Sequence, residues 1–117
     1  KEYLGGAIVP GNRISMEALE SKTAKLPAVE IAVPEKVIGK TTKESIQAGL
    51  FYGHIGTTKE IINRISQEAV DGKKPFVIGT GGFAHMFSDS GLFDTINSEL
   101  VLRGIYYSVK MNSQKEK

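Results

Sequence analysis

The most constraining feature of this chain is a strand-like run that ends in glycines and leads into an apolar stretch. Residues 75–84 read Pro-Phe-Val-Ile-Gly-Thr-Gly-Gly-Phe-Ala. This pattern predicts a strand over 76–78, a tight glycine turn, and a helix over 83–87. Backbone amides at such a helix start can face a nucleotide, and adjacent glycines let a flat base or ribose lie on the main chain. A plain strand-to-helix turn explains the same residues, so both interpretations stay open.

The composition narrows the classes of protein to consider. At 117 residues, the chain is one domain or part of one, and its 40% hydrophobic and 24% charged residues are ordinary for a soluble protein. A net charge of +2 is too small to favour nucleic acid, and no apolar run approaches the ~18 residues of a membrane span. The absence of cysteine excludes disulfides and thiolate metal sites. We therefore expect a cytoplasmic protein with no nucleic-acid or membrane partner.

The amino-terminal segment looks like part of a sheet. The chain starts at Lys1 without a methionine and enters an apolar stretch at once. We predict a strand over residues 3–9, in which Gly5 and Gly6 would let another backbone or a ligand come close. Because such a segment is not typical of a terminus, we expect further sequence upstream.

Two elements are predicted between residues 12 and 33. Asn12 is expected to cap a helix that carries Ile14, Ala18 and Leu19 on one side. Residues 29–33 alternate between apolar and other side chains, which predicts a short strand that Pro34 ends.

A longer helical region follows. Thr41 and Glu44 have the spacing of a capping box, and we expect a second cap or a kink at Thr57-Thr58. The first part of this region carries a mixed stripe of small and large residues, which suits close helix packing: Ile46, Gly49, Leu50 and Gly53.

The last part of the chain holds a loop over 88–92 and a helix over 102–112. The helix is expected to turn Leu102, Ile105, Tyr106 and Val109 inward. Residues 113–117 form a polar tail, so residues 1–112 are predicted to be one lobe.

No strong catalytic constellation is present. His54 and His85 are isolated and are interpreted as ordinary helix-surface or core histidines. The aspartates near turns suit local hydrogen bonding: Asp71, Asp89 and Asp94. Residues 39–41, Gly-Lys-Thr, copy the end of a phosphate loop without its earlier glycine. We predict no catalytic residue and no metal ligand within this chain.

Thr23 lies where the first helix is expected to end, before a rigid Leu26-Pro27 step. Its hydroxyl could bond a local carbonyl. Alternatively, it could be held out toward a small polar substrate. Both roles stay open from the residues alone.

Several phrases together resemble the second half of type III pantothenate kinases. They occur in order along the whole chain: Tyr-Leu-Gly-Gly-Ala-Ile-Val-Pro-Gly at 3–11, Thr-Ala-Lys-Leu-Pro at 23–27, Ile-Gly-Lys-Thr-Thr at 38–42, 49–53, Thr-Gly-Gly-Phe-Ala at 80–84, and 100–104. The resemblance implies a ribonuclease H-like (actin-like ATPase) α/β lobe, with a mixed sheet flanked by helices that is incomplete without upstream sequence.

The resemblance also implies site residues. Thr80, Gly81 and Gly82 would belong to the ATP-binding turn, where adenosine lies. Thr23 would face pantothenate, and Gly5 and Gly6 would lie on a strand that enters the substrate and dimer region. ATP with Mg²⁺ and a monovalent cation, K⁺ or NH₄⁺, is expected on the same basis, as is a homodimer.

The departures from the family pattern are equally informative. The Asp-x-Gly-Asn-Thr phosphate loop and the Gly-x-Asp-Arg segment that carries the catalytic aspartate are absent from these 117 residues. We therefore expect catalytic residues in a missing amino-terminal lobe, and no activity from this chain alone. A non-catalytic regulatory or binding protein of the same fold is the alternative. The phrase at 23–27 argues against another sugar-kinase-like enzyme.

Overall fold

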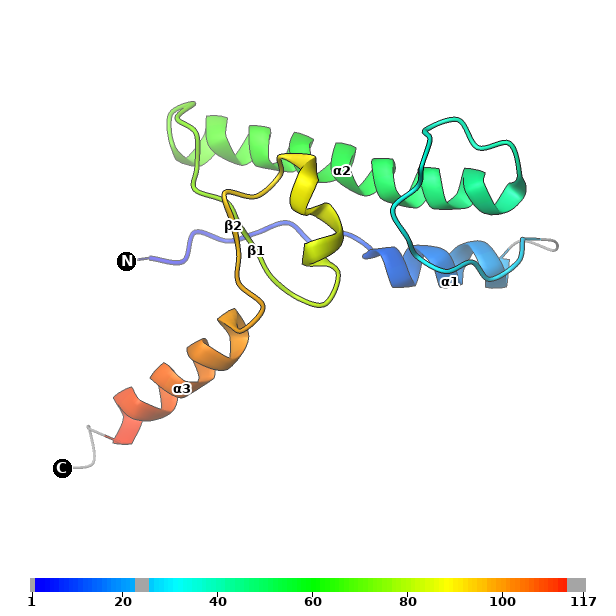
Figure 1. Cartoon of the computed structure of the whole chain (residues 1–117). Helices are drawn as coiled ribbons and strands as arrows, with labels where there is room; N and C mark the ends of the chain where they lie inside the picture. The colour runs from blue at the N-terminus through cyan, green and yellow to red at the C-terminus, as the bar shows by residue number, and fades with distance from the viewer. Residues whose placement is uncertain (1, 23–25, 114–117) are drawn as a thin grey trace. The chain divides into compact units, whose positions relative to one another are not determined.

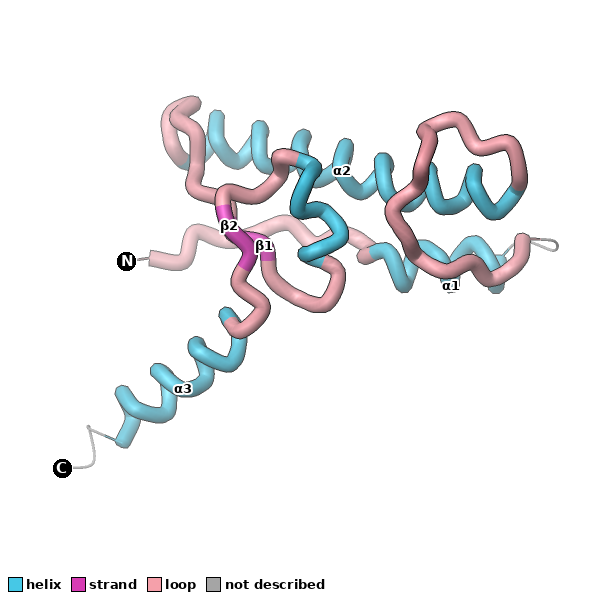
Figure 2. The backbone as a smooth tube through the Cα atoms, in the orientation of Figure 1, coloured by secondary structure: helices cyan, strands magenta, loops and turns pink. Residues whose placement is uncertain are grey.

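The computed structural model describes residues 2–22 and 26–113. The chain divides into two compact units, Lys1–Pro75 and Phe76–Lys117, which are described separately. Figures 1 and 2 show the path of the chain and its elements, which are α1 (Asn12–Lys22), α2 (Thr42–Ala69), β1 (Ile78–Gly79), the 3₁₀ helix η1 (Ala84–Ser90), β2 (Thr95–Ile96) and α3 (Leu100–Ser113). The chain thus combines helices with a short parallel sheet, which makes it a mixed α/β protein.

The first unit is built on the pair of helices α1 and α2, which lie side by side (Figure 1). Met16, Val29 and Ile46 form its buried cluster. Partly buried apolar side chains pack around this cluster: Leu19, Leu26, Ile31 and Leu50. Burial of these side chains, rather than sheet pairing, holds this unit together.

The predicted first helix is present, but its start and its buried side differ from the prediction. The Ser15 N–H donates to the Gly11 carbonyl over 2.9 Å, so Gly11 is the cap and Asn12 is the first helical residue. Glycine is an acceptable residue at this position. Met16 turns to the core, whereas Ile14 is 60% exposed. Of the predicted stripe, Leu19 packs against the buried cluster as expected, whereas Ile14 and Ala18 are exposed.

The capping box at the start of α2 is confirmed. The Glu44 N–H donates to Thr41 Oγ1 over 3.2 Å, and the Thr41 N–H donates to Glu44 Oε2 over 3.2 Å. The predicted second cap or kink at Thr57-Thr58 is wrong, because α2 runs unbroken for 28 residues. A threonine hydroxyl can bond within the helix, so a threonine pair does not by itself end one.

Two predicted strands are absent. Residues 3–9 and 29–33 have no ladder partner in the described part of the chain, and Ile8 is fully exposed. A strand exists only where its backbone groups pair with another strand. The apolar alternation therefore predicted the burial of Val29 correctly, but it could not show whether residues 29–33 have a partner strand.

The second unit contains a two-stranded parallel sheet. Ile78 pairs with Thr95, and Gly79 pairs with Ile96. The strand predicted over 76–78 is therefore displaced toward the glycines, and its partner was not predicted. The helix predicted over 83–87 is the 3₁₀ helix η1, which continues through part of the predicted loop.

The last helix is longer than predicted and differently exposed. α3 spans Leu100–Ser113 and has no buried residue. The four side chains predicted to point inward are exposed, so that prediction is wrong for the structure of this chain: Leu102, Ile105, Tyr106 and Val109. None of the helices within the described residues is both long enough and apolar enough to cross a membrane.

Candidate functional site

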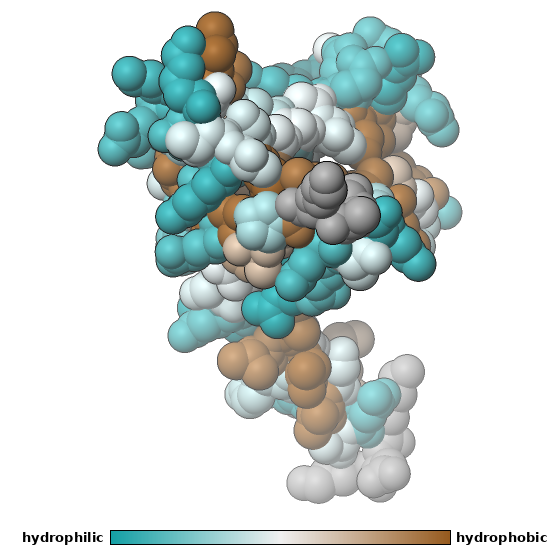
Figure 3. Space-filling view, turned by 90° about the vertical axis from the view of Figure 1, so that its right-hand side faces the viewer, coloured by the Kyte–Doolittle hydropathy of each residue, from teal (hydrophilic) through white to brown (hydrophobic). Residues whose placement is uncertain are grey.

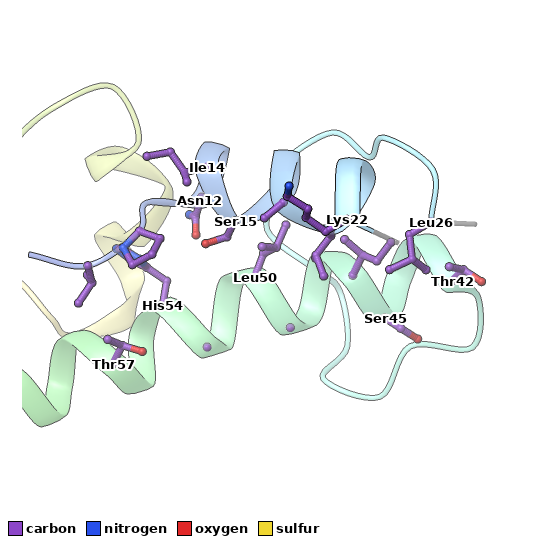
Figure 4. Close-up of a pocket in the computed structure, with 17 residues that line it drawn as sticks. Asn12, Ile14, Ser15, Lys22, Leu26, Thr42, Ser45, Leu50, His54 and Thr57 are labelled. Atoms are coloured by element: carbon purple, nitrogen blue, oxygen red, sulfur yellow. The ribbon is translucent and has the colours of Figure 1, made fainter. Parts of the chain in front are cut away.

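A groove of about 980 Å³ runs along α1 and α2 in the first unit. Figure 4 shows side chains from both helices turned toward it. On α2, the lining residues fall in two rows with a spacing of four: Thr42, Ile46, Leu50 and His54, and Ser45, Gly49, Gly53 and Thr57. Residues four apart lie on one helix face, so a single face of α2 forms one wall.

The floor of the groove depends on two glycines. A Cβ atom added to Gly49 or to Gly53 would have no heavy atom within 4 Å. Among the described residues, no neighbour packs closely against these two glycines. Ile46 and Leu50 make the packing contacts of that stripe instead. The missing side chains leave room that a ligand or another chain can occupy.

Polar groups stand along the otherwise apolar walls. Asn12, Ser15, Thr42, Ser45, His54 and Thr57 line the groove with amide, hydroxyl and imidazole groups (Figure 4). Lys22 adds a positive charge near the carboxy-terminal end of α1. An apolar hollow with a few polar groups is the usual character of a site for a small molecule. This groove suits a molecule with an apolar body and polar or anionic ends.

The first unit also matches a known family. The sequence model of the family described as "Type III pantothenate kinase" matches residues 1–64, which include α1, most of α2 and the whole groove lining.

The chain belongs to the type III pantothenate kinase family.

Curated type III pantothenate kinases match nearly the whole chain. Its identity to the protein of Legionella pneumophila (strain Corby) is 51% over 113 residues, which is 97% of this chain and 44% of that protein. Its identity to "Type III pantothenate kinase 1" of Francisella tularensis subsp. holarctica (strain OSU18) is 53% over 112 residues, again 44% of that protein. The chain thus spans less than half the length of these type III pantothenate kinases and matches their carboxy-terminal part.

Two of the predicted substrate-binding residues of this type III pantothenate kinase chain, Gly5 and Gly6, do not line the groove. Gly5 and Gly6 line a separate hollow of about 340 Å³ beside the second half of α2, together with Ile61 and Arg64. Gly5 has a φ of +122°, which suits glycine. Thr23 lies outside the described residues.

The predicted ATP-binding turn lies in the second unit and is open. Thr80, Gly81 and Gly82 are exposed. Gly81 has a φ of +90°, whereas Gly82 does not have positive φ and its added Cβ would have no heavy atom within 4 Å. Gly79 differs, because a Cβ there would lie 2.7 Å from the Phe93 ring. Gly79 is thus required by packing and Gly81 by backbone conformation, whereas among the described residues neither requirement applies to Gly82.

The helix after the turn offers less to an anion than the sequence suggested. η1 is a seven-residue 3₁₀ helix, and its cap residue Phe83 provides no side-chain hydrogen bond. The Ala84 N–H already donates to the Gly81 carbonyl over 3.2 Å. A short 3₁₀ helix aligns few amides, so the open glycine backbone is the stronger feature of this turn.

The remaining candidate polar residues are spread over both units. The Asp94 carboxylate accepts from the Val77 N–H over 2.8 Å and fixes the start of β1. Asp71 has a φ of 54° in the turn after α2, and His85 is exposed. His54 is the one isolated histidine that reaches the groove. Within residues 2–22 and 26–113, no three His, Cys, Asp or Glu side chains are grouped to hold a metal.

Proposed function

We propose that this chain is the carboxy-terminal lobe of a kinase that transfers the γ-phosphoryl group of ATP to pantothenate. The product would be 4′-phosphopantothenate, in the first step of coenzyme A biosynthesis. The observation that carries this proposal is the identity of about one residue in two to type III pantothenate kinases over 97% of the chain. Phosphoryl transfer depends on positioning and charge neutralisation, so a lobe without a catalytic base can still contribute.

The groove supports the substrate part of the proposal. Pantothenate has an apolar dimethyl centre, an amide and hydroxyl groups, and a carboxylate. The apolar walls match the dimethyl centre, and the hydroxyls of Ser15 and Ser45 can bond the amide and hydroxyl groups. Lys22 offers a cation to the carboxylate. Thr23 follows Lys22 in the sequence and would add a hydroxyl.

The glycine turn supports the nucleotide part. Thr80, Gly81 and Gly82 would form a flat platform for adenosine, since no side chain covers the two glycines. The described residues do not fit a Mg²⁺ site, because no cluster of acidic ligands is present among them. We therefore assign no step of this lobe to Mg²⁺, K⁺ or NH₄⁺, and we place the metal ligands and the catalytic base in the amino-terminal lobe.

The proposal extends to the assembly. A ribonuclease H-like lobe in a two-lobed, cytoplasmic enzyme would account for extended segments that lack a strand partner here. We infer a homodimer whose face includes α1 and α2, because these helices present an open apolar groove.

A regulatory protein of the same fold is the second candidate. The Gly-x-Asp-Arg segment distinguishes the two candidates: a longer protein that contains an intact segment would be a kinase, and one that has lost it would be a regulator. Such a protein would bind ligand or partner through the same groove without transferring phosphate.

A chimera separates the two candidates. We would join the amino-terminal part of the Legionella pneumophila relative, which this chain does not match, to residues 1–117 and measure ATP-dependent formation of phosphopantothenate. The chimera is expected to be active and residues 1–117 alone to be inactive, because a base must reach the attacking hydroxyl. A folded chimera that binds ATP but forms no product would favour the regulator. Product formation by residues 1–117 alone would refute the proposal that the catalytic base lies in the amino-terminal lobe.

Thr23 provides a finer test in the same chimera. Thr23→Val should raise the apparent constant for pantothenate about tenfold to hundredfold and leave that for ATP nearly unchanged, since one polar contact is worth roughly 1–3 kcal/mol. Thr58→Val is the matched control, because Thr58 is in α2 and does not line the groove. Equal effects of the two changes would leave Thr23 with a structural role only.

A further inference from the structure

α3 has an apolar surface that the other described residues of the second unit do not cover. The α3 stripe, defined here as Leu102, Ile105, Tyr106 and Val109, has the spacing of one helix face. Its members are between 57% and 68% exposed. Figure 3 shows hydrophobic residues in brown on this part of the molecule. A helix of this kind gains most of its stability from packing its apolar face.

Apolar side chains also occupy a second side of α3. Tyr107 is 59% exposed and Met111 is 64% exposed, and neither lies on the α3 stripe. Arg103 and Lys110 separate the two apolar sides along one edge of the helix, as their spacing requires. Two apolar sides on one helix indicate that it is covered from more than one direction.

We propose that α3 docks against the amino-terminal part of the longer protein, which this chain lacks. The inference rests on the proposed function, in which that part is the other lobe. The matched relatives contain a further part that could cover α3, because this chain covers only 44% of their length. In this arrangement α3 ties the two lobes together and is itself not a catalytic element.

A second copy of this chain is a poorer occupant. Pairing α3 with another α3 would cover one side of each helix and leave either the α3 stripe or Tyr107 and Met111 in water. Every charged side chain within α3 is basic, so two copies would also bring like charges together. The chemistry of α3 calls for an apolar cleft whose rim carries carboxylates.

Cysteine labelling tests this proposal directly, because the chain contains no cysteine. We would introduce Ile105→Cys and Val109→Cys in the α3 stripe, Tyr107→Cys on the second side, and Lys110→Cys as the control on the charged edge. Each would be placed in residues 1–117 alone and in the chimera with the Legionella pneumophila amino-terminal part, after any cysteines there are replaced by serine. The rate of reaction with a thiol reagent reports the exposure of each position.

We expect all four positions to react quickly in residues 1–117 alone. In the chimera, labelling at 105, 107 and 109 should slow at least about tenfold, whereas labelling at 110 should change less than about twofold, since a covered site reacts only when it opens. The same cysteines at the matching positions of the Legionella pneumophila protein replace the chimera if the chimera does not fold.

Three outcomes would overturn the proposal. Equal labelling with and without the amino-terminal part would show that α3 stays uncovered. Protection in residues 1–117 alone that grows with protein concentration would assign α3 to a second copy. Equal slowing at 105 and 110 would indicate general compaction. Kinase activity is measured separately, so protection without activity contradicts the proposed function alone, and activity without protection contradicts the docking alone.

Discussion

Each unit of this chain contains a helix with apolar residues at helical spacing, α2 in the first and α3 in the second. The two helices differ in how much of that apolar surface is buried. α2 contributes Ile46, Ala48, Phe51 and Ser66 to the buried residues, whereas α3 contributes none. Both have apolar residues at helical spacing and both are present in the structure. The difference shows that periodicity predicts a helix and its apolar face, but the partner of that face must be found elsewhere.

The largest expected effect comes from matched isoleucines in the two helices. Ile46→Ala in α2 should lower the free energy of unfolding by about 2–5 kcal/mol, because Ile46 belongs to the buried cluster. Ile105→Ala in α3 should change it by no more than about 0.5 kcal/mol, because Ile105 is 57% exposed. Urea unfolding of residues 1–117, followed by circular dichroism, measures both. Similar losses at both sites would remove the contrast between the helices.

A pair of glycines gives the next effect. In Gly39→Ala, the new Cβ would lie 2.6 Å from the Glu44 carbonyl carbon, so the backbone before α2 must move at a cost of about 1–3 kcal/mol. In Gly82→Ala, the Cβ would enter open space, and a loss of unfolded-state freedom should make the change neutral or stabilising by about 0.4–1 kcal/mol. The same unfolding measurement applies. Destabilisation by Gly82→Ala would mean that the turn has a packing partner.

Gly82 can then be tested with nucleotide in the chimera. Gly82→Val should raise the Michaelis constant for ATP at least about tenfold, or 1.4 kcal/mol, and that for pantothenate much less. Because Gly82 lacks positive φ and steric neighbours, the variant should keep its thermal stability without ATP and lose the stabilisation that ATP gives. If ATP stabilises the variant as fully as its parent, the residues Gly81 and Gly82 form only a turn.

The smallest expected effect compares the two helix starts. Thr41→Ala removes the hydroxyl of the capping box and should cost about 1 kcal/mol. Asn97→Ala removes the acceptor of a 3.1 Å bond from the Glu99 N–H, one residue before α3, and should cost less because that bond lies outside the helix. Thermal unfolding ranks the two. A larger loss of stability for Asn97→Ala than for Thr41→Ala would contradict the expected ranking of the two helix starts.

Features set by neighbours in sequence were predictable. The start of α2 followed from Thr41 and Glu44, which bond each other across one turn. The existence of α3 followed from its spacing. The β1–β2 pairing was not predictable, because it rests on contacts seventeen residues apart, such as the Val77–Asp94 bond. The segments over 3–9 and 29–33 were predicted as strands because alternation does not reveal whether a pairing partner exists.

The candidate site was only partly visible in the sequence. The stripe of Gly49 and Gly53 was found, but close packing was inferred where the structure has a hollow. A usable signal was present, since Ser45 and Thr57 continue the glycine row at intervals of four and place small polar groups at both ends. The ATP-binding and substrate-binding assignments of individual residues stay predictions.

The unbroken course of α2 has a mechanical consequence. At 1.5 Å per residue, its 28 residues form a rod about 42 Å long. The groove lies against its first half, and the hollow of Gly5 and Gly6 lies against its second half. Both hollows therefore lie against one continuous helix. If a ligand or partner in one hollow tilts α2, the other end of the helix must tilt with it, because no break in the helix separates them.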